Sequence, residues 1–140
     1  MPLTVEHVKS IMDPCGQGIW EPFLSSIAPD VAWWIASDVQ DPSIPTGVYN
    51  FAEWKQAVNV RAFGRLKDGH QDMKVLSIDV VGQKAYVEAA GKATQLNGRP
   101  YNNCFCWILF FDEESKKIVK IREYMNTALT KEVLSMNEGP

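Results

Sequence analysis

The sequence has few of the residues that bind metals or form disulfides. Its 140 residues include only two histidines, which lie far apart in the chain with no cysteine or carboxylate beside them at ligand spacing. We therefore expect no metal site. Cys104 and Cys106 lie two apart on a predicted strand, where they are too far apart to bridge easily. With Cys15 they are predicted to be three free thiols, as a reducing compartment allows.

The sequence also lacks a strong charge, a long apolar run and a glycine-rich phosphate loop. Its net charge is -3, and no cluster of Lys and Arg forms a basic face, which argues against a nucleic-acid partner. No apolar run approaches the roughly 20 residues that cross a bilayer, and the first residues do not resemble a signal peptide. We expect a soluble cytoplasmic protein that uses no nucleotide or other cofactor.

What the sequence has is enough apolar material for one core. Hydrophobic residues make up 46% of the chain, and its length suits a single domain over residues 1–140.

Helical signals dominate the first half of the chain. Thr4 is a possible N-cap for a helix that Pro14 ends, and a second short helix is predicted from about Gly18 to Pro29. Asn50 and Glu53 form the pattern of a capping box, which predicts a third helix. The apolar stripe of that helix is Phe51, Trp54, Val58, Ala62 and Leu66.

Strand signals dominate the second half. Val31–Ser37 is rich in aromatic and branched residues, and later strands are predicted over Met73–Val81 and Ile118–Met125, with a helical piece from about Thr127. Between these strands Asn97 and Gly98 separate two long strand-forming runs. Asn-Gly is a strong signal for a two-residue hairpin turn.

A two-residue turn would place Leu96 opposite Arg99 and so fix the register of the hairpin. Asn102, Cys104 and Cys106 would then share a small, mostly apolar face with residues such as Ala89. The large aromatic residues would lie on the opposite face; they are Tyr86, Tyr101, Phe105 and Trp107. The order of helices and strands indicates an α+β fold. We expect a strongly curved, mostly antiparallel sheet wrapped around three helices, forming a cone with an internal pocket.

Two motifs in the last third resemble those of a known family. Gly98, Pro100, Tyr101 and Asn103 form the first motif, and the sequence Arg-Glu-Tyr-x-Asn at 122–126 forms the second. Together with the order of elements, they resemble the SnoaL-like branch of the nuclear transport factor 2-like superfamily, which also contains the ketosteroid isomerases. The resemblance implies a nuclear transport factor 2-like fold and a cofactor-free enzyme.

The resemblance also implies where a site would lie. Members that move protons often have titratable groups at the positions of Asn102 and Asn126, and here both are neutral amides that could only donate and accept hydrogen bonds. Asp38, at the end of the first strand on the side predicted for Trp34, is then the first candidate base. The competing interpretation is that Asp38 is an ordinary turn residue that caps its own loop.

Glu123 is a second candidate acid. Strand alternation would place it on the face opposite Asn126, where pairing with a basic side chain is favoured. His70 is either a solvated loop residue or a catalyst, and Cys106 is either a small filler or a substrate contact. The residues expected to contact a substrate are Trp34, Tyr49, Phe63, His70, Cys106 and Tyr124.

The leading hypothesis is an isomerase, cyclase or dehydratase acting on a hydrophobic polyketide or terpenoid intermediate of secondary metabolism. Asn102 and Asn126 would hold the substrate's oxygens, and Asp38 would move a proton. The alternative is a non-catalytic ligand-binding or assembly domain of the same fold. In either case the outer sheet face, with Tyr86 and Trp107 beside Glu88, suits a homodimer.

Overall fold

The structure is a computed structural model that describes residues 2–36, 38–39 and 41–136. It has one six-stranded sheet with the strand order β2-β1-β6-β5-β4-β3. The strands are β1 (Ile27–Ile35), β2 (Gly47–Tyr49), β3 (Asp72–Val81), β4 (Lys84–Thr94), β5 (Pro100–Phe111) and β6 (Ile118–Met125). The β1–β6 pair is parallel and the other pairs are antiparallel. The sheet is therefore mixed, and the predicted α+β class is confirmed.

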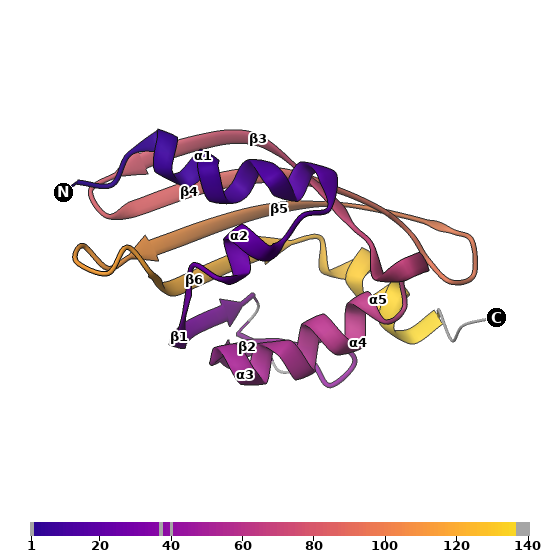
Figure 1. The fold of residues 1–140 in the computed structure, drawn as a ribbon. Helices are drawn as coiled ribbons and strands as arrows, with labels where there is room; N and C mark the ends of the chain where they lie inside the picture. The colour runs from indigo at the N-terminus through magenta and orange to yellow at the C-terminus, as the bar shows by residue number, and fades with distance from the viewer. Residues whose placement is uncertain (1, 37, 40, 137–140) are drawn as a thin grey trace.

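The helices pack mainly on one face of this sheet. They are α1 (Val5–Met12), α2 (Glu21–Leu24), α3 (Phe51–Trp54), α4 (Arg61–Phe63) and α5 (Thr127–Met136). Short helical segments connect them, namely the 3-10 turns η1 (Asp13–Gln17) and η3 (Lys67–Gly69) and the π-helical segment η2 (Lys55–Val60). Figure 1 shows α1 along β3 and β4, the α3–α4 stretch on the side of β1, and α5 near the tip of the β4–β5 hairpin. No described helix is long and apolar enough to cross a membrane.

The helix N-caps predicted at Thr4 and Asn50 are confirmed. The Thr4 hydroxyl oxygen accepts a hydrogen bond from the backbone N–H of His7 at the start of α1. Asn50 and Glu53 form both hydrogen bonds of the capping box at the start of α3. Both interactions involve residues three apart, so they depend only on local sequence.

Two segments differ from the prediction. The second helix ends at Leu24, and Ile27 already begins β1, which runs past Pro29 where the register with β6 shifts. Such an irregularity tolerates a proline because the missing N–H breaks no regular ladder hydrogen bond. The predicted end of this strand, Ser37, lies outside the described residues. The third helix widens into a π-helix at η2, and Leu66 lies beyond it in a bridge to Gln95.

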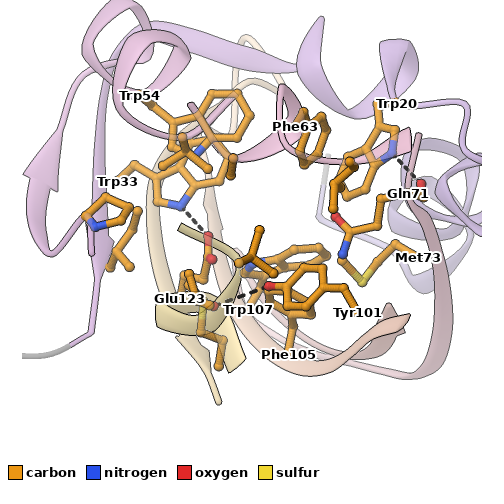
Figure 2. A pocket seen from close by; sticks show the side chains of 18 of the residues that line it. Trp20, Trp33, Trp54, Phe63, Gln71, Met73, Tyr101, Phe105, Trp107 and Glu123 are labelled. Carbon is orange, nitrogen blue, oxygen red and sulfur yellow. Dashed lines mark hydrogen bonds between the residues drawn. The ribbon is translucent and has the colours of Figure 1, made fainter. Parts of the chain in front are cut away.

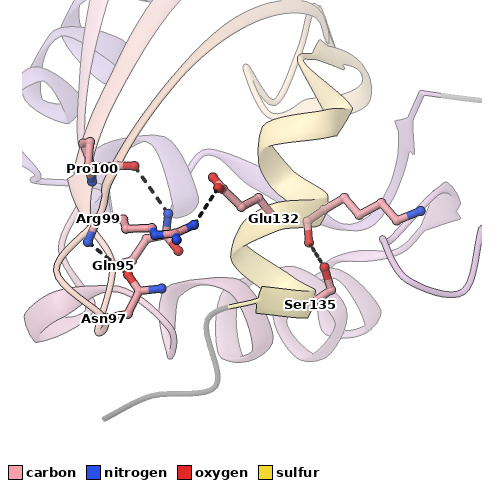
Figure 3. Close-up of polar contacts among 7 residues, drawn as sticks. Gln95, Asn97, Arg99, Pro100, Glu132 and Ser135 are labelled. Atoms are coloured by element: carbon pink, nitrogen blue, oxygen red, sulfur yellow. Dashed lines mark hydrogen bonds and ion pairs between the residues drawn. The ribbon is translucent and has the colours of Figure 1, made fainter.

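The hairpin register differs from the prediction by one residue. The loop has three residues, Leu96 to Gly98, because the backbone N–H of Gln95 donates to the carbonyl of Arg99, and Gly98 takes a positive φ of 87°. Ala89 therefore pairs with Phe105 instead of Cys106. Figure 3 shows the loop contacts, including the ion pair of 3.3 Å between Arg99 and Glu132 of α5.

A shift of one residue turns every side chain of β5 to the other face. Asn102 and Cys104 are exposed on the outer face, and Cys106 is half-buried there. The inner face instead carries Asn103 and three aromatic residues that the prediction placed outside, Tyr101, Phe105 and Trp107, all buried. The small residues of β4 do lie inside, so they face helices and large aromatic rings.

In strands β1 and β6, too, the buried face is the opposite of the one predicted. Trp33 is 1% exposed on the inner face, while Trp34 is half-buried on the outer face. In β6, Glu123 is 5% exposed and points inward, and Tyr124 points outward. The expected pairing of Glu123 with a basic side chain on the sheet surface is therefore wrong.

The inner face and the helices enclose an aromatic core. The rings of Trp33 and Trp54 stack with centroids 4.2 Å apart and an interplanar angle of 9°. Phe23 stacks on Trp107 at 5.8 Å, which joins α2 to the centre of β5. Large rings that contact one another in this way fix the space between sheet and helices.

Candidate active site

An internal cavity lies between the sheet and the helices, and large aromatic side chains form much of its wall. Figure 2 shows Trp33 and Trp54 on one side, Trp20 and Gln71 on the other, and Phe105 and Trp107 between them. Further lining residues come from α4 and α5, including Phe63 and Thr130. The cavity thus draws on both halves of the chain.

The cavity is small as it stands. Its volume, measured by where the centre of a water molecule fits, is about 60 Å³. One water molecule needs roughly 10–15 Å³ by that measure. The cavity therefore has room for only a few waters, and a larger guest requires side chains or helices to move.

Glu123 is the acidic residue of this cavity. Its side chain enters from β6, and its Oε1 accepts a hydrogen bond of 2.8 Å from the indole N–H of Trp33 in β1. The hydrogen bond is possible because β1 and β6 are adjacent parallel strands, in which both residues face inward. None of the ion pairs among the described residues includes Glu123.

Burial raises the pKa of Glu123 from its usual value of 4.5 to about 7. The cause is desolvation, because the charged carboxylate loses water and gains no cation in exchange. The indole N–H groups of Trp33 and Trp107 oppose this rise. The Trp107 N–H lies close enough for this effect, although its geometry falls outside that of a hydrogen bond. A carboxyl group with this pKa exchanges protons readily near neutral pH.

A polar network closes the cavity beside α5. The Asn103 amide donates to the Tyr101 hydroxyl at 2.9 Å and to the Thr130 hydroxyl at 3.2 Å. Its oxygen accepts from the backbone N–H of Asn126 at 3.2 Å. Burial raises the pKa of Tyr101, and the nearby charge of Glu123 adds to that rise. Within the first motif, Tyr101 and Asn103 thus tie β5 to the start of α5.

The two amides predicted to hold a substrate do not reach the cavity. Asn102 is exposed on the outer face and borders a separate open groove on the surface. Asn126 is also exposed, and its side-chain oxygen accepts from the backbone N–H of Ala128 at 3.1 Å. The prediction that both amides project inward is wrong. It assumed that the other set of alternate residues in β5 and β6 faces the helices.

The observed role of Asn126 is to cap α5, which gives a stability prediction. Asn126→Ala should lower the free energy of unfolding by about 1 kcal/mol, since it leaves the first N–H groups of the helix unpaired. Asn126→Asp, which retains a capping oxygen, should stay close to wild type. Urea unfolding of the three proteins measures both values, and equal stability of all three would contradict the capping role.

The other candidate base and its neighbours also lie outside the cavity. Asp38 is an exposed loop residue and does not line the cavity. Trp34 and Tyr124 contact each other on the outer face, with ring centroids 5.3 Å apart. The guanidinium of Arg122 lies 4.1 Å from the Trp34 ring. These residues form an outer cluster in place of the predicted substrate contacts.

Of the remaining predicted contacts, only Phe63 lines the cavity. The Tyr49 hydroxyl donates to the carbonyl of Thr46 at 2.9 Å, beside a shallow surface pocket. His70 is exposed in a 2.7 Å contact with Asp72, and Cys106 is on the outer face. Among the residues that the structure describes, no group of three His, Cys, Asp or Glu could hold a metal ion.

Trp33, Trp107 and Gln71 line the cavity although the sequence did not single them out as site residues. One signal for Glu123 was available, since Lys120 and Arg122 flank Ile121 in β6 and basic residues favour the solvent face. That alternation places Ile121 and Glu123 together on the buried face. Gln71 gave no signal, because it belongs to a polar segment before β3.

Comparison with known proteins identifies the fold. No family model matches the sequence, and no curated protein matches it. Solved structures do: an NTF2-like protein from Burkholderia thailandensis has a TM-score of 0.70 at 16% identity, covering 93% of this chain and 95% of that one. IdmH from Streptomyces antibioticus, a proposed polyketide cyclase, has a TM-score of 0.68 at 15% identity, covering 92% and 96%.

A third structure, TerC co-crystallized with polyporic acid, has a TM-score of 0.70 at 17% identity. It covers 91% of this chain and 97% of that one. The chain therefore has the NTF2-like fold over nearly its whole length, and proposed SnoaL-like polyketide cyclases share that fold. TM-scores of 0.68 to 0.70 establish the fold, and identities of only 15% to 17% leave the activity to be argued from the site.

Proposed function

We propose that the protein is a cofactor-free enzyme that cyclises, isomerises or dehydrates a hydrophobic polyketide or terpenoid intermediate. The observation that carries this proposal is Glu123, a buried carboxyl with a pKa of about 7 in a cavity walled by aromatic rings. Strong desolvation of a single carboxyl in a concave apolar site is typical of an acid-base catalyst. Asp38, Asn102 and Asn126 have no place in this proposal.

The Glu123 carboxylate would remove a proton from a carbon next to a substrate carbonyl, leaving an enolate and a protonated Glu123. The same proton would return to another carbon in an isomerisation, or to a leaving hydroxyl in a dehydration. In a cyclisation the enolate carbon would attack a second carbonyl, and Glu123 would protonate the resulting alkoxide. Each sequence returns Glu123 to the carboxylate and consumes no cofactor.

The comparisons support the substrate class. TerC was co-crystallized with polyporic acid, and IdmH is a proposed polyketide cyclase of similar size and the same fold. Aromatic walls such as Trp33 and Phe105 favour a flat apolar guest, and a few polar atoms would orient it. The cavity volume of about 60 Å³ implies that side chains or helices move when a substrate enters, and we propose that the α3–η2–α4 stretch is the part that moves. A π-helical segment in that stretch is a common feature of functional sites.

A product search tests the proposed function. The purified protein is incubated with polyketide and terpenoid intermediates that carry an enolisable carbonyl, and products are analysed by mass spectrometry and NMR. We expect a product of unchanged mass, or of mass reduced by one water, from at least one substrate. Asn102→Ala serves as the matched control and should give the same product. A product that forms equally without protein, or with Glu123→Gln, would contradict an enzymatic role for this site.

The alternative is a non-catalytic domain that binds a ligand or assembles through its sheet, and the small cavity favours it. The outer face carries four half-buried large side chains, Trp34, Tyr86, Ile108 and Phe110. We propose that a second copy of the chain packs there in either case. Sedimentation analysis should show a dimer that Phe110→Lys dissociates, and a monomeric wild type would remove this proposal.

A further inference from the structure

The Gln71 side chain lines the cavity and carries an unpaired hydrogen-bond donor that packs against Gly91. The residue is 3% exposed, and its Nε2 has no hydrogen-bond partner. Buried amide groups are almost always paired, so an unpaired one needs an explanation. The indole N–H of Trp107 is also unpaired and also at the cavity. The Trp107 N–H lies near the Glu123 carboxylate, whereas no acceptor among the described residues pairs with Gln71 Nε2.

Neighbouring residues hold the Gln71 amide in place. The backbone carbonyl of Gln71 accepts a 2.9 Å hydrogen bond from the indole N–H of Trp20, which anchors the residue before β3 begins. Gly91 leaves the space that the amide occupies. A Cβ at Gly91 would lie 2.8 Å from Gln71 Nε2 and 3.2 Å from Phe105 Cε1, so the end of the Gln71 side chain would have to move. The sequence therefore keeps room for this amide within a tightly packed wall.

Gln71 and Glu123 lie on opposite sides of the cavity. Figure 2 shows the Gln71 amide beside Met73 at one side and the Glu123 carboxyl beside Trp33 at the other, with Trp107 and Tyr101 between them. A guest that places its reacting carbon at Glu123 would therefore extend toward Gln71. An apolar end there would leave the donor unpaired, whereas an oxygen acceptor would satisfy it.

We propose that Gln71 is a specificity-determining residue whose Nε2–H donates to a carbonyl oxygen of the substrate, at the end remote from Glu123. The inference rests on the proposed function, since it places a second contact in the same cavity. The inferred substrate is elongated. It has an acceptor oxygen at the end near Gln71 and an acidic C–H at the end near Glu123. Gln71 binds and orients the guest, and Glu123 moves the proton.

A matched pair of probes tests the contact without turnover. The two probes are 2-acetylnaphthalene and 2-isopropenylnaphthalene, which have nearly the same shape and differ in a carbonyl oxygen that replaces a CH₂ group. Binding is measured by 1H–15N NMR titration, with the Gln71 side-chain amide signals assigned by their loss in Gln71→Met. Wild type should bind the ketone about tenfold more tightly, the usual size of one neutral hydrogen bond to a buried donor. The ketone should also shift the Gln71 amide signals downfield.

Two variants should remove this preference. Gln71→Met keeps the length of the side chain and loses the amide, and Gly91→Ala displaces the amide by the added Cβ. Both should bind the two probes equally, while Asn102→Ala on the outer face should keep the tenfold difference. Thermal unfolding confirms that each variant is folded. A wild type that binds both probes equally or binds neither, or a Gln71→Met protein that keeps the preference, would overturn the inference.

The Gln71 contact and the enzymatic role of Glu123 can be tested independently of each other. Glu123→Gln leaves Gln71 intact and should keep the preference for the ketone even if turnover is lost. Loss of turnover in Glu123→Gln, without any ketone preference in wild type, would overturn the role of Gln71 alone. A ketone preference that depends on Gln71, in a protein that turns over no substrate, would retain this contact and remove the enzymatic proposal.

Discussion

Glu123→Gln should lower kcat by about 100-fold to 10,000-fold on the substrate that the product search identifies, the usual range for removing a general acid-base group. Glutamine has the same shape and can still accept the hydrogen bond from the Trp33 indole, but its amide cannot take up or return a proton near neutral pH. The loss should therefore fall on kcat, with KM little changed. Steady-state kinetics of the folded variant measures both constants.

The pH dependence of the wild type provides a second readout of the same role. If removal of a proton by the carboxylate limits the rate, kcat should rise with pH through about 7, following the pKa of Glu123. Asn102→Ala should show the same profile because Asn102 lies on the outer face. A Glu123→Gln enzyme with wild-type kcat would show that the cavity acts by shape alone and that no proton passes through this residue.

The wild-type protein should lose stability as the pH rises from about 4.5 to about 7, and this change should be absent in Glu123→Gln. The folded protein binds the Glu123 proton more tightly than the unfolded chain does, because burial raises the pKa of this group. Stability from this group is therefore fully present below the unfolded pKa, and it is lost as the pH rises through the folded pKa.

The expected size follows from the difference between the two pKa values. A gap from 4.5 to about 7, at about 1.4 kcal/mol per pH unit, gives a loss of about 3 kcal/mol above pH 7. Glu123→Gln should accordingly be more stable than wild type at pH 8 and close to it at pH 4.5. Urea unfolding at several pH values measures the difference between the two proteins. A difference that does not change with pH would show that Glu123 titrates as an exposed carboxyl does.

A stability difference that does grow with pH would fit burial of Glu123 that serves catalysis, because this burial is unfavourable for folding. A buried carboxylate without a cation lowers stability at neutral pH, and many point substitutions could relieve it. Trp33 offers one hydrogen bond, which compensates for only part of the lost hydration. The arrangement leaves the carboxyl poised to exchange a proton, at a cost in folding free energy.

The parts of the fold that could be predicted from the sequence depend on neighbouring residues. The Asn50 capping box and the Thr4 cap satisfy helix N–H groups three residues away, so local sequence determines them. Strand β6 was predicted at its observed bounds, Ile118–Met125, because branched residues cluster there. The α+β class followed from the order of these elements.

The candidate site could not be predicted in the same way, because it depends on which face of each strand is buried. Asn97-Gly98 is compatible with loops of two or three residues, and the observed three-residue loop reverses β5. The observed register buries Phe105 and Trp107 against the helices, and this long-range packing cannot be seen in the local sequence of the turn. The buried carboxyl also runs against the ordinary preference of Glu for the surface, and such exceptions are expected at functional sites.

The most direct test of this account is a 13C NMR titration of the Glu123 carboxyl carbon in protein labelled at glutamate, with the signal assigned by its loss in Glu123→Gln. We predict a midpoint near pH 7, well above those of the exposed glutamates. A Glu123 midpoint near 4.5 would contradict the account, since it would place the carboxyl in water and remove the proposed catalyst from the cavity.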